Sequence, residues 1–178
     1  MPGAAVASVT EESLRLKPLL SHTQFQAVHP PCHTMSEPLL TYRGTVYPWH
    51  CDHVGHMNVM WYVGKFDEAS WQLFNAIGLS VPHLRSAGRG MAAVDQHISY
   101  LQELHAGAVV SVRTRLLEVK ERSVRFEHEM VDDTCGAVAA RTTLKAVHLD
   151  VVQRKSTAFA AAVIAKAQAL VAATTASA

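Results

Sequence analysis

The feature that most constrains the fold is a single long helical period in the middle of the chain. Between residues 58 and 77, apolar side chains recur at helical spacing, which predicts an amphipathic helix of about five turns. Gly78 follows the last periodic residue and predicts the helix end, while Asn58 is a candidate N-cap. The side chains expected on the buried face are Val59, Val63, Phe66, Leu73 and Ile77, and those expected on the opposite, solvent-facing side are Lys65, Glu68, Gln72 and Asn75.

Strand-like runs surround this helix. In residues 123–132, apolar and charged side chains alternate, which predicts a strand with one buried face. The connections between runs are too short for parallel crossovers, so the sheet should be antiparallel. We therefore expect an α+β fold, in which a five-stranded antiparallel sheet wraps around one long central helix and an extra helix follows at the C-terminus. The expected strands cover residues 39–49, 91–101, 108–120, 123–132 and 137–151, and residues 80–90 are expected to form a loop.

The 178 residues fit one domain with two tails. Residues 1–37 are rich in proline and show no sustained period, so we expect a flexible N-terminal extension. Residues 38–155 hold the expected helix and strands. Residues 156–178 are rich in alanine and predict a C-terminal helix or tail.

Composition excludes several classes of partner. Sixteen Lys and Arg against 15 Asp and Glu give a net charge of +1, which argues against nucleic acid or an anionic membrane surface. No apolar run is long enough to cross a bilayer. The three cysteines form no close pair in the sequence, which favours a reducing compartment, and we expect a cytoplasmic protein.

Residues 47–62 concentrate groups that carry chemistry. Asp52, several histidines and Asn58 lie just before the expected start of the long helix. Free backbone N–H groups at a helix N-terminus favour developing negative charge. A carboxylate beside them can act as nucleophile or general base while those N–H groups stabilise an oxyanion. This arrangement is the one that acyl transfer needs.

The pattern Asp52-x-x-Gly55-His56-x-Asn58-x-x-x-Tyr62 resembles the hotdog-fold acyl-CoA thioesterases, and within them the 4-hydroxybenzoyl-CoA thioesterase-like family. The acidic helix segment 66–69 strengthens the resemblance, and the segment from His97 to Gly107 is similar to that family's second strand and its turn. The resemblance covers about residues 39–151.

This resemblance implies hydrolysis of an acyl-CoA thioester to free acid and CoA by a homodimer or homotetramer. CoA would be part of the substrate, and no separate cofactor or metal is implied. Asp52 falls on the family's catalytic carboxylate, and the backbone N–H near Val59 falls on its oxyanion donor. His56 or Asn58 would orient the carboxylate, the water or the thioester. Many members carry a second Asp two residues earlier, where this chain has His50.

The expected substrate-binding residues are Gly55, Trp61, Tyr62 and Arg122. Aromatic side chains next to Asp52 suit the lining of an acyl pocket. CoA carries phosphates, so basic side chains should lie near the pocket mouth, and Arg122 is one of several candidates there. The acyl group is open at this stage, and an acyl carrier protein could replace CoA as the thioester donor.

Other functions remain as alternatives. A hotdog hydratase or dehydratase would depend on His56 or His97 paired with an acid. A non-catalytic acyl-CoA-binding protein could use the same fold. His50, His53 and His56 are spaced by three and could be read as a weak metal motif. Cys51 is a candidate nucleophile that ranks below Asp52.

Overall fold

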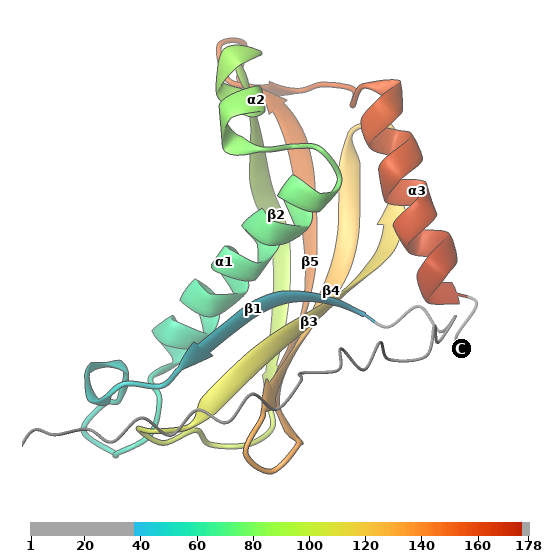
Figure 1. Cartoon of the computed structure of the whole chain (residues 1–178). Coiled ribbons are helices and arrows are strands. Elements are labelled where there is room, and N and C mark those ends of the chain that lie inside the picture. Colours follow the sequence, from blue (N-terminus) through green and yellow to red (C-terminus); the bar gives the residue numbers. More distant parts are fainter. Residues whose placement is uncertain (1–37, 176–178) are drawn as a thin grey trace, which may run out of the picture. The chain divides into compact units, whose positions relative to one another are not determined.

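A computed structural model describes residues 38–175, so the expected extension over residues 1–37 lies outside the described part. Figure 1 shows a sheet with one long helix lying across it. The elements in chain order are β1 (Leu39–Thr45), η2 (Pro48–His50, a 3-10 helix), α1 (Val59–Ala76), α2 (Val81–Ser86), β2 (Arg89–Tyr100), β3 (Val109–Val119), β4 (Ser123–Asp132), β5 (Ala137–Asp150), β6 (Lys155–Ser156) and α3 (Ala161–Thr175).

The sheet has the order β1-β3-β4-β5-β2, and every neighbouring pair is antiparallel. The expected α+β architecture, with five main strands around one long helix, is confirmed. A short sixth strand, β6, adds a hairpin to the end of β5. The alternating pattern in β4 is also confirmed, because Val124, Phe126, His128 and Met130 are all buried.

Helix α1 starts and ends where the sequence predicts. Asn58 is the N-cap, and its side-chain oxygen accepts a hydrogen bond from the Met60 N–H at 3.0 Å. After the C-cap residue Ile77, Gly78 has a φ of +93°, in the left-handed region that favours glycine.

The buried face of α1 differs from the prediction at three positions. Val59 and Val63 were expected inside, but they are 56% and 39% exposed. Lys65 was expected on the solvent side, but it is only 3% exposed. Its ammonium group donates a hydrogen bond to the Tyr42 hydroxyl at 2.8 Å and lies over the Tyr42 ring. This partner on β1 lets the aliphatic stem of Lys65 be buried, which a helical period cannot reveal.

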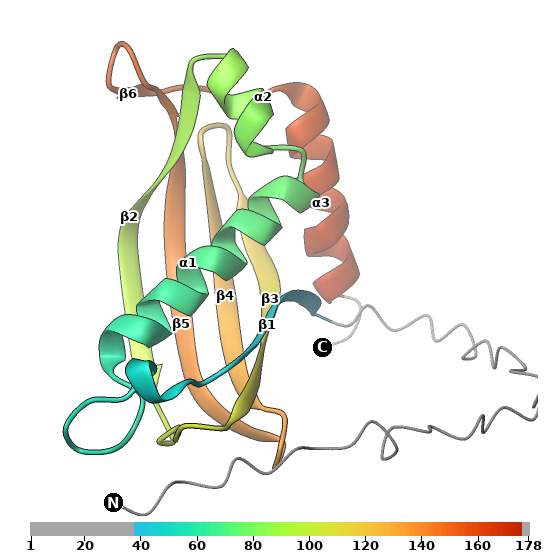
Figure 2. The ribbon, with the colours of Figure 1, turned by 60° about the vertical axis from the view of Figure 1, so that its left-hand side comes forward.

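Two hydrophobic clusters make up the core. One surrounds the N-terminal half of α1 and includes Tyr62, Phe66 and Met57. The other joins the C-terminal half of α1 to α3, because Leu73 and Val163 belong to the same cluster. Figure 2 shows α1 crossing the sheet and α3 beside it. Among the helices within residues 38–175, none is long and apolar enough to span a bilayer.

Two local predictions were wrong at proline positions. The first strand was expected to reach Trp49, but β1 ends at Thr45 and Pro48 begins the 3-10 helix η2. Residues 80–90 were expected to form a loop, but they contain the short helix α2. Ser80 caps α2 by accepting a hydrogen bond from the His83 N–H at 3.4 Å.

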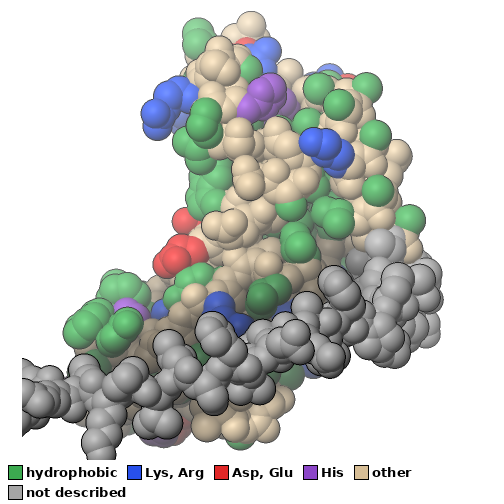
Figure 3. All heavy atoms as spheres, viewed as in Figure 1, with side chains coloured by type: hydrophobic (Ala, Val, Ile, Leu, Met, Phe, Trp, Pro, Cys, Tyr) green, Lys and Arg blue, Asp and Glu red, His purple; other side chains and the backbone are tan. Residues whose placement is uncertain are grey.

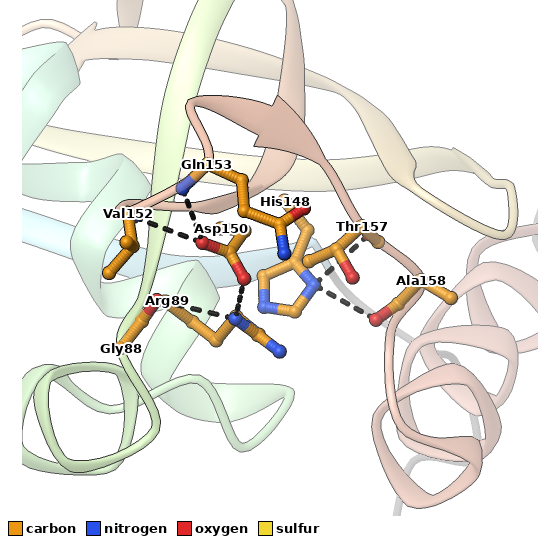
Figure 4. Close-up of polar contacts among 8 residues, drawn as sticks. All are labelled: Gly88, Arg89, His148, Asp150, Val152, Gln153, Thr157 and Ala158. Carbon is orange, nitrogen blue, oxygen red and sulfur yellow. Dashed lines mark hydrogen bonds and ion pairs between the residues drawn. The ribbon is translucent and has the colours of Figure 1, made fainter.

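The end of the sheet near α2 is held by a polar cluster at the turn between β5 and β6 (Figure 4). Asp150 forms an ion pair with Arg89 of β2 and accepts hydrogen bonds from two N–H groups of the turn. The hydrogen bond from the Gln153 N–H is the main cause that lowers the pKa of Asp150. The His148 ring of β5 stacks on the ring of Phe159, which lies in the segment between β6 and α3.

A buried chain of side chains connects α1 to the sheet. The Thr41 hydroxyl contacts the Thr114 hydroxyl at 2.6 Å, and Thr114 contacts Nδ1 of His128 at 2.6 Å. Nε2 of His128 lies 3.0 Å from the Ser70 hydroxyl on α1, which donates a hydrogen bond to the Phe66 carbonyl. A neutral imidazole has one N–H and one lone pair, so one ring nitrogen of His128 donates a hydrogen bond in this chain and the other accepts one. Burial lowers the pKa of His128 to about 3, so the ring is neutral near pH 7.

We expect His128 to make the fold less stable in acid. Below pH 6.5, the usual pKa of a histidine, His128 binds a proton in the unfolded chain. In the folded protein, its ring stays neutral down to about pH 3. Between these values the free energy of unfolding should fall by up to about 1.4 kcal/mol for each pH unit lost. Urea unfolding of wild type and His128→Gln between pH 4.5 and 7.5 measures this effect. The stability difference between the two proteins should shrink as pH falls, and a constant difference would contradict the assignment.

Candidate active site

The candidate site is a tight loop between η2 and α1. The Asp52 N–H donates a hydrogen bond to the His56 carbonyl at 3.1 Å, and Cys51 and Met57 form an isolated antiparallel bridge. Gly55 turns the loop with a φ of +96°, a conformation that side chains with a Cβ rarely adopt. Gly55 was expected to bind substrate, and the structure assigns it this turn.

The Asp52 carboxylate is held from two sides. One oxygen accepts a hydrogen bond from the Val54 N–H at 3.0 Å, and the other accepts one from the Asn58 side-chain amide at 3.3 Å. The hydrogen bond from Val54 is the main cause that lowers the pKa of Asp52, partial burial opposes it, and His56 and Asn58 add smaller lowering effects. An ionised carboxylate at neutral pH is the state that a nucleophile or a general base needs.

The first turn of α1 offers one free backbone donor. The Met60 N–H is taken by the Asn58 side chain, and the Trp61 N–H by the Asn58 carbonyl. Within residues 38–175, the Val59 N–H has no hydrogen-bond partner. It also lies at the positive end of the helix dipole, where developing negative charge is stabilised.

A pocket of about 220 Å³ opens at this helix start. Its walls come from the loop before α1, the first turn of α1, and the chain that leaves β2. Figure 3 shows hydrophobic side chains at the surface near the start of α1. The pocket is lined by His56, Met57, Val59, Tyr62, Tyr100, Leu101, Gln102 and Glu103. The structure therefore brings His56, Val59 and Tyr62 together at this pocket, whereas Asp52 and Asn58 are not among its lining residues.

The remaining sequence candidates lie elsewhere. Trp61 does not line the pocket, and its ring packs against the His50 ring with centroids 4.3 Å apart. Burial and the nearby Lys65 charge lower the pKa of His50. His97 is exposed on β2 and is not a core residue.

Arg122 is not near Asp52 within one chain. It lies in the turn between β3 and β4, and its carbonyl accepts a hydrogen bond from the His148 N–H at 2.9 Å. His148 is paired with Met91 near the beginning of β2, whereas the Asp52 loop contacts the chain beyond the end of β2. The local sequence around Arg122 does not indicate which end of the sheet this residue occupies.

The histidines of the loop do not form the alternative metal site. Within the described chain, no group of three or more His, Cys, Asp or Glu side chains could hold a metal ion. His56 instead faces Glu103, with 3.8 Å between its Nε2 and the carboxylate.

Sequence reasoning missed the contribution of the segment after β2. The Met57 N–H donates to the Leu104 carbonyl at 2.6 Å, and the His105 ring contacts the Gly55 carbonyl at 3.1 Å. These contacts place Tyr100 and Glu103 in the pocket wall. The sequence indicated only a turn there, because nothing in the local pattern pairs that turn with a loop about 50 residues earlier.

Known proteins resemble this chain in both sequence and structure. The model of the thioesterase-like superfamily matches residues 46–167. A betainyl-CoA thioesterase from Pseudomonas aeruginosa is 29% identical over 76% of this chain and 86% of that protein. An L-carnitine dehydrogenase/betainyl-CoA thioesterase from Agrobacterium fabrum is 32% identical over 57% of this chain, and the match spans 21% of that protein.

The fold also matches solved structures. A Staphylococcus aureus protein in complex with CoA superimposes with a TM-score of 0.71 at 19% identity, covering 76% of this chain and 86% of that one. The hotdog fold expected from the sequence is thus confirmed, as is acyl-CoA thioester hydrolysis as the activity of the family. The chain belongs to the thioesterase-like superfamily.

Proposed function

We propose that this protein hydrolyses the CoA thioester of a small acyl group that carries a quaternary ammonium, as in betainyl-CoA, with Asp52 as the catalytic carboxylate. The observation that carries the proposal is an ionised Asp52, held by the Asn58 side chain, in the loop that leads into the N-terminus of α1, where the Val59 N–H is free. The names of two relatives support the acyl group. The free thiols of Cys51 and Cys135 support the cytoplasm as its compartment.

The proposed mechanism begins with the thioester carbonyl oxygen at the Val59 N–H. In one route, Asp52 takes a proton from water as the water oxygen attacks the carbonyl carbon. The C–S bond then breaks, and the leaving thiolate receives that proton, which gives free acid and CoA. In the other route, Asp52 attacks the carbon directly, and the C–S bond breaks to release the CoA thiolate and give a mixed anhydride. Water hydrolyses the anhydride to the free acid and the Asp52 carboxylate, and the proton that is released goes to the thiolate. In both routes, the negative charge that develops on the carbonyl oxygen is stabilised at the helix N-terminus.

We further propose a homodimer that forms through the edge strand β2. Residues 93–97 of β2 are all exposed, although they lie in the middle of a strand of 12 residues. An exposed edge with Val94 at 55% exposure is a template for pairing with a second copy. Antiparallel pairing about a two-fold axis would bring the beginning of one β2 next to the end of the other. This arrangement would carry Arg122 toward the Asp52 site of the other copy, where it could meet CoA phosphates.

Asp52→Asn should abolish most of the activity. The amide is a poor base and nucleophile, so we expect kcat to fall by at least about 100-fold, while KM changes little. Release of free thiol from acyl-CoA measures both constants. His56→Ala, run beside it, should retain more activity than Asp52→Asn. The opposite order of the two variants would show that hydrolysis depends on His56 more than on Asp52 and would contradict the proposed role of Asp52.

Asn58 should contribute to stability and activity through different atoms. Asn58→Asp keeps an oxygen for the Met60 N–H but loses the amide that donates to Asp52. We expect this variant to fold with near-normal stability and to lose kcat. Asn58→Ala should also have a lower kcat. In addition, its free energy of unfolding should fall by about 1 kcal/mol, the usual cost of a lost cap. Thermal unfolding and thiol release separate the two effects, and full activity in Asn58→Asp would contradict the positioning role.

The proposed dimer predicts a mass in solution of twice 19.4 kDa or a multiple of it. Val94→Lys should weaken the pairing of β2, because a lysine on an edge strand opposes strand addition. Val152→Lys, in the exposed turn after β5, is the matched control and should leave the mass unchanged. Light scattering after size-exclusion chromatography measures the masses. A monomeric wild type would refute the dimer.

A further inference from the structure

The pocket at the start of α1 has the chemical features of a cation site. The exposed ring of Tyr100 packs edge to face against the buried ring of Tyr62, with centroids 5.2 Å apart and an angle of 80°. Glu103 belongs to the same lining, and its carboxylate lies 3.8 Å from Nε2 of His56. Among the eight described lining residues there is no lysine or arginine. Aromatic faces and a carboxylate together attract a quaternary ammonium, which has no N–H to donate.

The size of the pocket also suits a short acyl group. Its volume of about 220 Å³ is below the range of about 300–1,000 Å³ that is usual for pockets binding drug-sized ligands. Val59 lines the pocket and carries the free N–H proposed for the carbonyl oxygen. In a betainyl group the quaternary nitrogen is two bonds from the carbonyl carbon. With the carbonyl at Val59, the ammonium would lie within reach of this lining.

We infer that Tyr100 and Glu103 bind the quaternary ammonium of the acyl group and so determine a preference for cationic over neutral acyl-CoA, with the buried Tyr62 ring packed against Tyr100. The inference rests on the proposed function and adds the residues that select its substrate. Tyr100 is 47% exposed, which leaves ring surface accessible to a ligand. The Tyr62 hydroxyl donates a hydrogen bond to the Gln102 carbonyl at 3.2 Å, which fixes its ring.

The Glu103 charge acts inside this pocket. Burial raises the pKa of Tyr62 to about 12, and the charge of Glu103 adds to that rise. Tyr62 is therefore neutral at physiological pH, and the negative charge of Glu103 is felt at its ring. The same field would favour a fixed positive charge on the substrate.

Two substrates of equal shape test this inference. Betainyl-CoA carries a quaternary nitrogen, and 3,3-dimethylbutanoyl-CoA carries a quaternary carbon at the same position. The measurement is the ratio of their kcat/KM values, from release of free thiol. Because the positive nitrogen itself activates a thioester, the test is the change in this ratio between wild type and variants. Asp52 and Val59 are unchanged in all of these variants.

Glu103→Gln and Tyr100→Leu should each lower the ratio by about threefold to thirtyfold, the range expected for one lost cation contact. Tyr100→Phe keeps the ring and should keep most of the ratio. Glu118→Gln removes one exposed carboxylate on β3 and is the matched charge control, with the wild-type ratio expected. Glu103 is exposed, so its variant should fold even if Tyr100→Leu does not.

The possible results separate this inference from the proposed function. Turnover of betainyl-CoA with a ratio that stays unchanged in Glu103→Gln and in every folded Tyr100 variant would overturn the cation site alone. Turnover of the neutral thioester without any turnover of betainyl-CoA would overturn both the proposed acyl group and the cation site. A lowered ratio in Glu103→Gln with the wild-type ratio in Glu118→Gln would support the inference.

Discussion

The structure depends on the burial of one face of α1 against the antiparallel sheet. Phe66 and Leu73 place the two halves of that face in two hydrophobic clusters, and α3 completes the second cluster. The buried polar chain through His128 adds a directional contact between α1, β4 and the strands beside it. Helix α1 is thereby fixed along its length, and a fixed helix presents its N-terminus at one defined place.

Asn58 joins this fold to the chemistry. Its side-chain oxygen begins α1, and its amide nitrogen holds the Asp52 carboxylate. Because Asn58 uses the Met60 and Trp61 N–H groups, the Val59 N–H is the donor in the first turn that is left for a substrate oxygen. The geometry of the carboxylate and of the oxyanion donor thus depends on one residue. The segment after β2 then completes the wall of the pocket at the start of α1.

Much of this could be predicted from the sequence, and the reasons for the failures are specific. The bounds of α1, the alternation in β4 and the loop around Asp52 follow from local patterns, which a single sequence displays. The burial of Lys65 depends on Tyr42, and the place of Glu103 depends on contacts between two distant loops. Likewise, the position of Arg122 depends on which end of the sheet its turn occupies. These are tertiary contacts, and no periodicity or motif in one sequence records them.

The most direct test of the account is a crystal structure of the Asp52→Asn variant with a bound acyl-CoA. The account predicts that the thioester carbonyl oxygen lies about 3 Å from the Val59 nitrogen, with the substituted side chain next to the carbonyl carbon. The acyl group should then occupy the pocket lined by Tyr62 and Tyr100. A thioester bound with its carbonyl away from the start of α1 would contradict the central claim that this helix N-terminus and Asp52 act on the same carbonyl.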